Sequence, residues 1–406
     1  MAAIKYWVWL SALRMRPVAK IKLLDHFGYD PERLYYADAR ELTAVEGLTA
    51  ADIESMGIRE LETAMEILVR CDEQRLQIIT LQDAAYPWRL KNIYDPPVVL
   101  YGRGRLPMID EEAAIAIVGT REPTPYGIRM ARKFGEGLTE CGGLLISGLT
   151  RGIERASVQA ALSAGGRVVG VLGTSMDEAR GGLYEDVVVN GALLTEYPPG
   201  QKTYKSAFRE RNRITAGLSA GVLVVEAPAR SGTLLFAEEA LEQGKEIFVI
   251  PANADVSSCM GNHRLLKEGA HPVTEAWDVL VEYTDRYRGK LHRAPQKTMT
   301  YAEREQAELR EKYPDFVQVR VPNPKKEIDK PESVAYIDLE NDISDLSELQ
   351  QKLVAVLRLG ETAIDELIEA TEADTSAVLS ELTMLEIMGI VQQEPGKRFR
   401  LNQARG

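Results

Sequence analysis

The sequence between residues 113 and about 282 alternates short runs rich in β-branched residues with segments of helical periodicity. This alternation is typical of a parallel β-sheet that is covered by helices on both faces. The sequence therefore predicts an α/β fold for this part of the chain. We expect strands at residues 115–118, 144–147, 168–172, 193–196, 222–225 and 247–250.

Small or polar residues follow four of the predicted strands. Because the carboxyl ends of parallel strands meet at one edge of a sheet, where ligands collect against helix N-termini, these turns predict a binding site. One of the four turns is G-T-S, which follows the third strand. The other three turns contain Gly119, Thr120 and Arg121 after the first strand, Ser147, Gly148, Arg151 and Gly152 around the end of the second, and Ser231, Gly232 and Thr233 beyond the fifth.

The segment from Lys202 to Arg213 concentrates positive charge in a chain whose formal net charge is −12. It holds five Lys or Arg residues and one acid, Glu210, and it includes Tyr204 and Phe208. Basic side chains hold phosphates, and an aromatic ring accepts a base by stacking. We therefore predict a basic loop that binds a nucleic-acid strand. The alternative is a solvated loop whose arginines pair with carboxylates.

The sequence lacks the common motifs of nucleotide binding and catalysis. The first turn has no third glycine of G-x-G-x-x-G, and neither a phosphate-binding G-x-x-x-x-G-K-[ST] loop nor a G-x-S-x-G nucleophile motif occurs. Three cysteines and four histidines form no disulfide framework and no metal motif. Glu154, Glu196 and Glu226 could act as acids or bases, but each could equally orient an arginine. We expect no enzyme activity, no cofactor and no metal.

The flanking segments predict separate domains. Residues 1–75 read as short helices, with a weak resemblance to a helix-hairpin-helix turn in residues 42–56; a small helical packing module is the alternative. The apolar run near the N-terminus is too short to span a membrane, so we expect a cytoplasmic protein. We assign residues 76–284 to the sheet core and residues 285–345 to a charged linker.

The last segment, residues 346–406, predicts three helices and a β-wing, which together form a winged-helix domain. From Leu346 to Asn402 there are five basic and ten acidic residues, and the third predicted helix carries no Lys or Arg. This charge favours contact with a protein over insertion into the DNA major groove.

Several sequence blocks resemble the bacterial DNA-processing family DprA/Smf. They include I-A-I-V-G-T-R, L-I-S-G-L-T-R-G-I, L-L-T-E-Y-P-P-G, R-N-R-I-T-A-G-L-S and L-L-K-E-G-A, in the family's order, between about residues 80 and 282. The resemblance implies a Rossmann-like core with a helical N-terminal domain and a C-terminal winged-helix domain. It also implies a homodimer that binds single-stranded DNA and helps load the RecA recombinase during natural transformation or recombination, without a required enzymatic reaction.

The resemblance also implies roles for individual residues. Arg151 would lie over the strand-binding edge, and the turn residues Gly119, Ser147, Gly148, Gly152, Ser231 and Gly232 would allow close backbone approach. In the alternative interpretation, the arginines of the R-N-R block brace the sheet edge through carboxylates such as Glu226. The residues implied to line the pocket are Arg121, Lys205, Phe208, Arg211, Asn212 and Arg213.

The chain departs from the family pattern at four positions. It has Glu154 where Asp is usual, Val158 for His, Arg209 for Pro and Ala252 for Gly. Two other functions stay open. One is a nucleotide sensor or a phosphoribohydrolase-like enzyme, with Glu238 or Glu239 as the acid. The other is a scaffold that only contacts proteins through the acidic winged helix.

Overall fold

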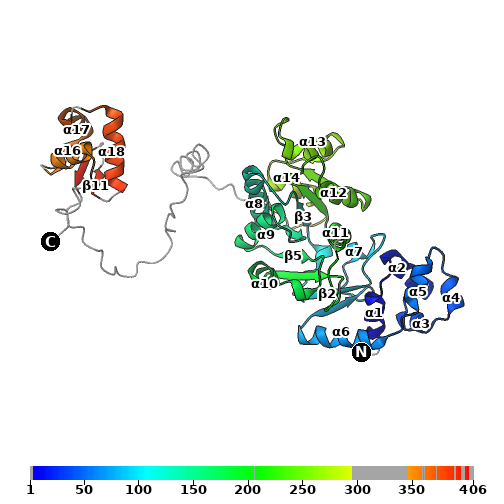
Figure 1. The fold of residues 1–406 in the computed structure, drawn as a ribbon. Helices are drawn as coiled ribbons and strands as arrows, with labels where there is room; N and C mark the ends of the chain where they lie inside the picture. Colours follow the sequence, from blue (N-terminus) through cyan, green and yellow to red (C-terminus); the bar gives the residue numbers. More distant parts are fainter. Residues whose placement is uncertain are drawn as a thin grey trace. The chain divides into compact units, whose positions relative to one another are not determined.

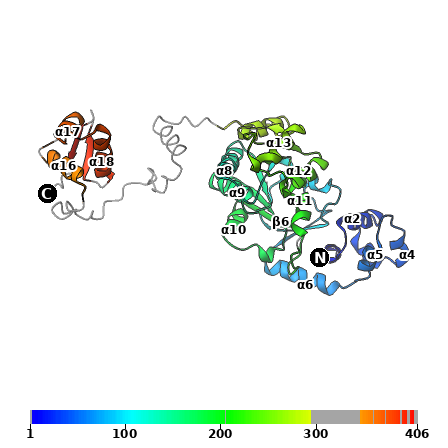
Figure 2. The same ribbon diagram turned by 45° about the horizontal axis from the view of Figure 1, so that its top comes forward.

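The computed structural model describes residues 3–204, 206–294 and 346–401, with gaps at residues 359, 361, 372, 388–389 and 395–397. Contacts divide the chain into two compact units, residues 1–298 and 299–406. Figures 1 and 2 show the first unit as a sheet with helices on both faces, and the second as a small helical unit with short strands.

One sheet in the described part of the first unit holds nine strands, in the order β1-β2-β6-β5-β4-β3-β7-β8-β9. Strand β2 runs antiparallel to β1 and β6, and the remaining neighbours are parallel. The six predicted strands are confirmed as β3 to β8. The strands are β1 (Gln77–Thr80), β2 (Val99–Gly104), β3 (Ala114–Val118), β4 (Leu144–Ser147), β5 (Val168–Val171), β6 (Gly191–Thr195), β7 (Gly221–Val224), β8 (Glu246–Val249) and β9 (His271–Pro272).

Successive residues of the central strands face opposite helical layers, because side chains alternate along a strand. Ala116 of β3 belongs to one buried cluster and Ile117 to the other. The first cluster includes side chains of α11 (Ala207–Leu218) and α12 (Gly232–Glu242). The second layer contains α8 (Pro125–Glu140), α9 (Ile153–Ser163), α10 (Gly182–Val189) and α14 (Ala276–Leu280).

The prediction of a basic loop up to Arg213 is wrong, because the segment is helical from Ala207 onwards. Helix α11 connects β6 to β7, which are parallel strands on opposite sides of β3. Such a connection must cross the sheet, and a helix is its usual form. Ile214 and Leu218 bury one side of α11 against the sheet, whereas the charges near its N-terminus conceal the helical pattern.

The N-terminal helices pack on the sheet core and share its first buried cluster. Leu10 and Leu24 are fully buried, and α1 packs along α6. Asp30, Asp38 and Thr49 begin helices as side-chain N-caps. These helices are α1 (Ile4–Ala12), α2 (Pro17–His26), α3 (Pro31–Tyr36), α4 (Ala39–Thr43), α5 (Ala50–Met56) and α6 (Leu61–Glu73).

The sheet core extends beyond residue 284. Tyr287 is buried, Leu291 packs against the second cluster, and the His292 amide donates to the carbonyl of Cys141 at 3.2 Å. Residues 285–294, which the sequence assigned to the linker, therefore belong with the core. The remainder of the predicted linker, residues 295–345, lies outside the described residues. Two further short helices of this unit are α7 (Trp88–Lys91) and α13 (Met260–Lys267).

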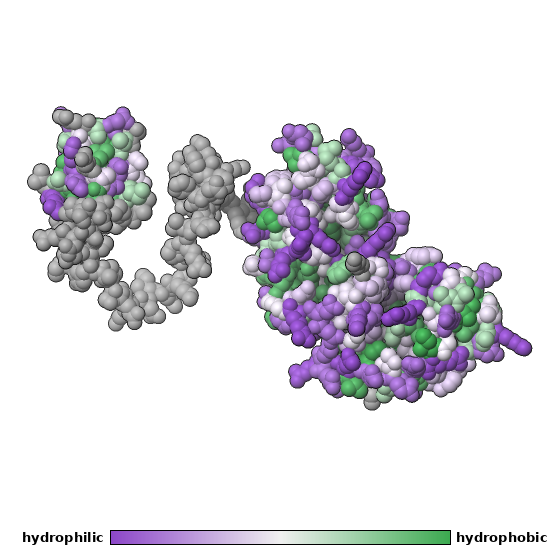
Figure 3. All heavy atoms as spheres, viewed as in Figure 1, coloured by the Kyte–Doolittle hydropathy of each residue, from purple (hydrophilic) through white to green (hydrophobic). Residues whose placement is uncertain are grey.

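The C-terminal unit has the predicted winged-helix architecture. Helices α16 (Glu348–Leu357), α17 (Ile364–Thr371) and α18 (Thr375–Ile387) surround a small core that includes Leu353 and Leu382. The wing strands are β11 (Val391–Glu394) and β12 (Arg398–Leu401), and β10 (Thr362–Ala363) pairs with β12. On the face of each unit that is visible in Figure 3, hydrophilic side chains predominate and apolar side chains lie scattered among them.

Candidate functional site

The predicted strand-end turns lie together at the carboxyl edge of the sheet. Strands β5, β4, β3 and β7 are neighbours in that order and run parallel. The strand order reverses at β3, because β4 to β6 follow on one side of it and β7 to β9 on the other, and open α/β sheets bind ligands at such a position. The Thr120 amide donates to the carbonyl of Glu226 at 2.8 Å, and the Ile153 amide donates to the carbonyl of Thr120 at 3.2 Å. These bonds join the turns after β3, β4 and β7.

Arg211 brings a buried positive charge to this edge. Its side chain comes from α11, is 3% exposed and lies against Gly148, where an added Cβ would be only 1.4 Å from Nη1. Nη1 donates to the carbonyl of Val171 at 2.9 Å, whereas Nε has no hydrogen-bond partner within the described ranges. Among the described residues no carboxylate lies within ion-pair distance of it. Burial, together with Arg121, lowers the pKa of Arg211, and Glu154 opposes the shift.

A buried cation without a carboxylate partner is costly unless another anion approaches it. The guanidinium offers planar donors that match phosphate oxygens. The surroundings of Arg211 therefore suit an anionic group that is not part of the protein.

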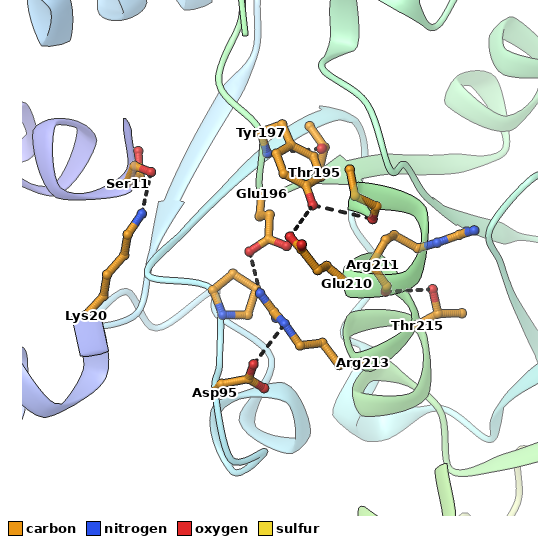
Figure 4. Close-up of polar contacts among 12 residues, drawn as sticks. Ser11, Lys20, Asp95, Thr195, Glu196, Tyr197, Glu210, Arg211, Arg213 and Thr215 are labelled. Carbon is orange, nitrogen blue, oxygen red and sulfur yellow. Dashed lines mark hydrogen bonds and ion pairs between the residues drawn. The ribbon is translucent and has the colours of Figure 1, made fainter. Parts of the chain in front are cut away.

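Arg213 lies in a different environment from Arg211. Nη2 donates to Oε2 of Glu196 at 2.5 Å, and Nε pairs with Oδ2 of Asp95 at 3.2 Å. Figure 4 shows the two guanidinium groups pointing in opposite directions from α11, as expected for residues about 200° apart around a helix. Burial would lower the pKa of Arg213, but Glu196 and Asp95 raise it above its ordinary value.

The prediction that Arg213 lines the binding pocket is therefore corrected: the structure gives it the bracing role that the sequence left as an alternative. The carboxylate suggested for that role, Glu226, is instead buried and accepts hydrogen bonds from the amide and hydroxyl of Thr124. Asp95 was missed because it lies in a Pro/Tyr-rich connector far from Arg213 in the sequence. The local signal for Asp95 is the motif Y-D-P-P, in which the two following prolines indicate an ordered backbone.

Two aromatic rings stand at the N-terminal end of α11. Phe208 is 40% exposed and packs against the backbone at Gly173, beyond β5. Tyr204 is 42% exposed, and its hydroxyl donates to Oε2 of Glu210 at 2.9 Å. Its ring contacts Tyr197 edge to face. Both rings keep enough free surface to accept a base.

The remaining predicted polar residues are less constrained. Arg121 is exposed, and Arg151 is exposed and pairs with Glu122 at 2.9 Å, a surface contact that contributes little to stability. Asn212 is partly buried on α11. Lys205 lies outside the described residues, so its predicted contact with a strand stays a prediction.

The small turn residues are used mainly for internal packing. An added Cβ at Gly119 would meet Ile153, and Gly152, with a φ of +86°, lies over the Thr120 carbonyl. Ser147 is buried and its hydroxyl accepts from the Leu149 amide. Of the turn after β7, Thr233 is buried and Gly232 faces open space. The Ser231 hydroxyl is buried, and no described residue forms a hydrogen bond with it.

The carboxylates considered as acids or bases have other partners. Oε2 of Glu154 accepts from the Thr150 amide at 3.1 Å. Glu238 pairs with Arg264, and Glu239 accepts from Gln243. No observation therefore favours the phosphoribohydrolase alternative.

Within the described ranges, no group of His, Cys, Asp or Glu side chains could hold a metal ion. In the same residues, no helix has the length and apolar character that crossing a membrane requires.

Comparison with known proteins gives consistent similarities. The family model of DNA recombination-mediator protein A matches residues 77–284, and that of the DprA winged helix domain matches residues 339–397. Protein Smf of Synechocystis is 31% identical over 97% of this chain and 98% of its own length. DNA processing protein DprA of Streptococcus pneumoniae is 38% identical over 52% of this chain and 75% of its own. The X-ray structure of the S. pneumoniae protein has a TM-score of 0.59 and 31% identity, covering 68% of this chain and 96% of that one.

Proposed function

The chain belongs to the family of DNA recombination-mediator protein A, and we propose that it binds single-stranded DNA at the carboxyl edge of its sheet. The observation that carries this proposal is the buried guanidinium of Arg211, which has no carboxylate partner among the described residues. The partly exposed Phe208 is three residues before Arg211 on α11, and the two side chains reach Gly173 and Val171 at the end of β5. A phosphate neutralises the guanidinium, and a neighbouring base stacks on the ring.

The arrangement suits a single strand better than a duplex. Stacking on Phe208 requires an unpaired base, because the faces of paired bases are already covered in a duplex. Stacking and phosphate contacts accept every base, so binding is expected to depend little on sequence. The exposed Arg121, in the turn after β3, adds positive charge at the same edge. The proposal includes no chemical step.

The second part of the proposal concerns partners. The family description names a recombination mediator, which supports delivery of the bound strand to a recombinase such as RecA. The proposal includes a homodimer of this chain as the acting species. The acidic composition of the winged-helix unit supports a role in contacting a protein rather than DNA. In this proposal the sheet edge holds the strand, and the protein acts inside the cell.

Binding of labelled oligo-dT and a matched duplex, measured by fluorescence anisotropy across a salt series, tests the first part. The wild type should prefer the single strand. Arg211→Ala should weaken binding and reduce the salt slope by about 0.7, the contribution of one phosphate contact on a single strand. Arg132→Ala, which removes an exposed arginine from the middle of α8, is the matched control and should bind like the wild type. Equal affinity for strand and duplex would contradict the proposal.

The second part is tested separately. Addition of the protein should increase the strand-dependent ATPase rate of RecA on DNA that is already covered by a single-strand-binding protein. Sedimentation of the full chain should show a dimer. An unchanged ATPase rate with intact strand binding would remove the mediator role and leave the strand site in place.

A further inference from the structure

A groove lies along α11, on the side of this helix that carries Arg209 and Arg213. It encloses about 830 Å³ between the α7 region, the C-terminal half of α12 and the outer face of α11. We call it the α11 groove; the residues that matter below are Trp88, Tyr94, Arg209, Lys245 and Arg286, with Glu242 as an opposing charge. Arg209 lies in the first turn of α11, and this helix starts beyond the carboxyl end of β6, so the groove begins near the sheet edge described above.

The cations of the α11 groove have fewer partners than its acids. Within the described residues, Arg209 and Arg286 have no carboxylate in ion-pair distance, and Lys245 makes only a 3.5 Å contact with the carbonyl of Gly217. Burial, with Arg89 and Arg286 nearby, lowers the pKa of Lys245 to about 8. These three side chains leave positive charge unneutralised in the groove.

Most acidic side chains of the groove form an ion pair or accept a hydrogen bond from a neighbouring residue. Asp95 pairs with Arg213, Glu210 accepts from the hydroxyl of Tyr204, and Glu239 accepts from the amide of Gln243. Glu242 has no such partner among the described residues. The neutral donors Tyr204 and Gln243 leave Glu210 and Glu239 charged, so the lining of the groove holds five basic and four acidic side chains, a net charge of +1 that favours an anionic occupant.

Two aromatic side chains add a second preference. Trp88 is 65% exposed and Tyr94 is 80% exposed, which is unusual for rings of this size. The short helix that carries Trp88 is held in place, since the Trp88 and Arg89 amides both donate to Asp110. Cations and exposed rings on an ordered wall are the features by which proteins hold single-stranded nucleic acid.

We propose that the α11 groove is a second contact region for the same single strand, in which Arg209, Lys245 and Arg286 contact phosphates and Trp88 and Tyr94 stack on bases. This inference rests on the proposed function, because the strand enters the groove from the sheet edge. Helix α11 has twelve residues and is about 18 Å long, the length of about five stacked nucleotides. Strands longer than the edge alone can hold should therefore gain affinity from the groove.

The test compares strands of roughly five and roughly twenty nucleotides of dT, lengths that bracket the usual site sizes of strand-binding folds. The double variant Trp88→Ala, Tyr94→Ala should bind the short strand like the wild type and the long strand at least about fivefold more weakly, the lower limit for one lost stacking contact. Arg286→Gln should also weaken only the long strand. Arg288→Gln, two residues along and outside the groove, is its matched control.

Intrinsic fluorescence provides an independent measurement. Trp7 and Trp9 are buried and Trp277 is partly buried, so Trp88 is the most exposed tryptophan among the described residues. The long strand should quench the emission of the wild type. Trp88→Phe should lose this quenching but keep the affinity, because phenylalanine still offers a ring.

The outcomes separate the two proposals. If the wild type binds neither strand, the proposed function and this inference both fail. If both strands bind, but neither the aromatic variants nor Arg286→Gln lowers the affinity for the long strand, the edge site stands and the groove inference is overturned. Thermal unfolding of each variant shows whether a loss of binding reflects a loss of fold.

Discussion

Replacing the two buried arginines of α11 one at a time should separate stability from DNA binding. Arg213→Ala leaves Glu196 and Asp95 without their partner, in side chains that are only 15% and 24% exposed. Breaking a buried pair by removing one member costs about 3–5 kcal/mol. At about 2.1 cal/mol/K of unfolding entropy per residue, for a first unit that spans residues 1–298, this lowers Tm by about 5–8 °C.

Arg211→Ala should behave in the opposite way. It removes a buried charge that has no carboxylate partner in the described part of the chain, and the lost hydrogen bond to Val171 contributes about 1 kcal/mol at most. Its Tm should therefore stay within about 2 °C of the wild type, while its affinity for single strands falls.

Differential scanning calorimetry and strand-binding anisotropy on both variants provide the measurements. The double variant Arg213→Met, Glu196→Gln, which removes both charges of the short ion pair, should recover part of the lost stability. If Arg211→Ala proved the less stable of the two single variants, the assignment of a bracing role to Arg213 and a binding role to Arg211 would be refuted.

Three further predictions follow from individual contacts. Gly148→Ala should displace the Arg211 guanidinium and lower strand affinity as much as Arg211→Ala does, and wild-type affinity in the anisotropy assay would contradict this. Phe208→Ala should weaken strand binding by about 5- to 150-fold, the range for one lost base–aromatic stack, with Tm unchanged, since the ring is 40% exposed; a Tm loss with intact binding would point to a packing role instead. Burial raises the pKa of Asp95 to about 6, against the attraction of Arg213, so the folded protein binds more protons than the unfolded chain between about pH 4 and 6. The free energy of unfolding, measured by urea titration, should therefore fall as the pH rises through that window. The fall in the wild type should exceed the fall in Asp95→Asn by up to about 3 kcal/mol. If the two proteins show parallel pH profiles, the raised pKa of Asp95 is contradicted.

The structure also shows how far individual residues could be predicted. The turn after β3 was placed correctly because Ile115 to Val118 form an apolar run that ends in Gly119, a local pattern. The loop prediction for residues 207–213 failed because Arg209, Glu210, Arg211 and Arg213 hide a helix whose apolar side appears only at Ile214 and Leu218. Helical periodicity needs several turns to become visible, and the predicted segment ended too early.

The sequence by itself determined the order of strands and helices, the edge where the small turns gather and the winged-helix unit, because these depend on short-range periodicity and on residues adjacent in the chain. Only the tertiary structure decided which of two arginines, both in R-N-R, is paired with carboxylates. That outcome depends on Asp95 and Glu196, which reach Arg213 from separate elements, whereas no carboxylate of the described chain reaches Arg211. A charge in a protein interior is defined by the groups that surround it, and those groups come together only when the chain folds.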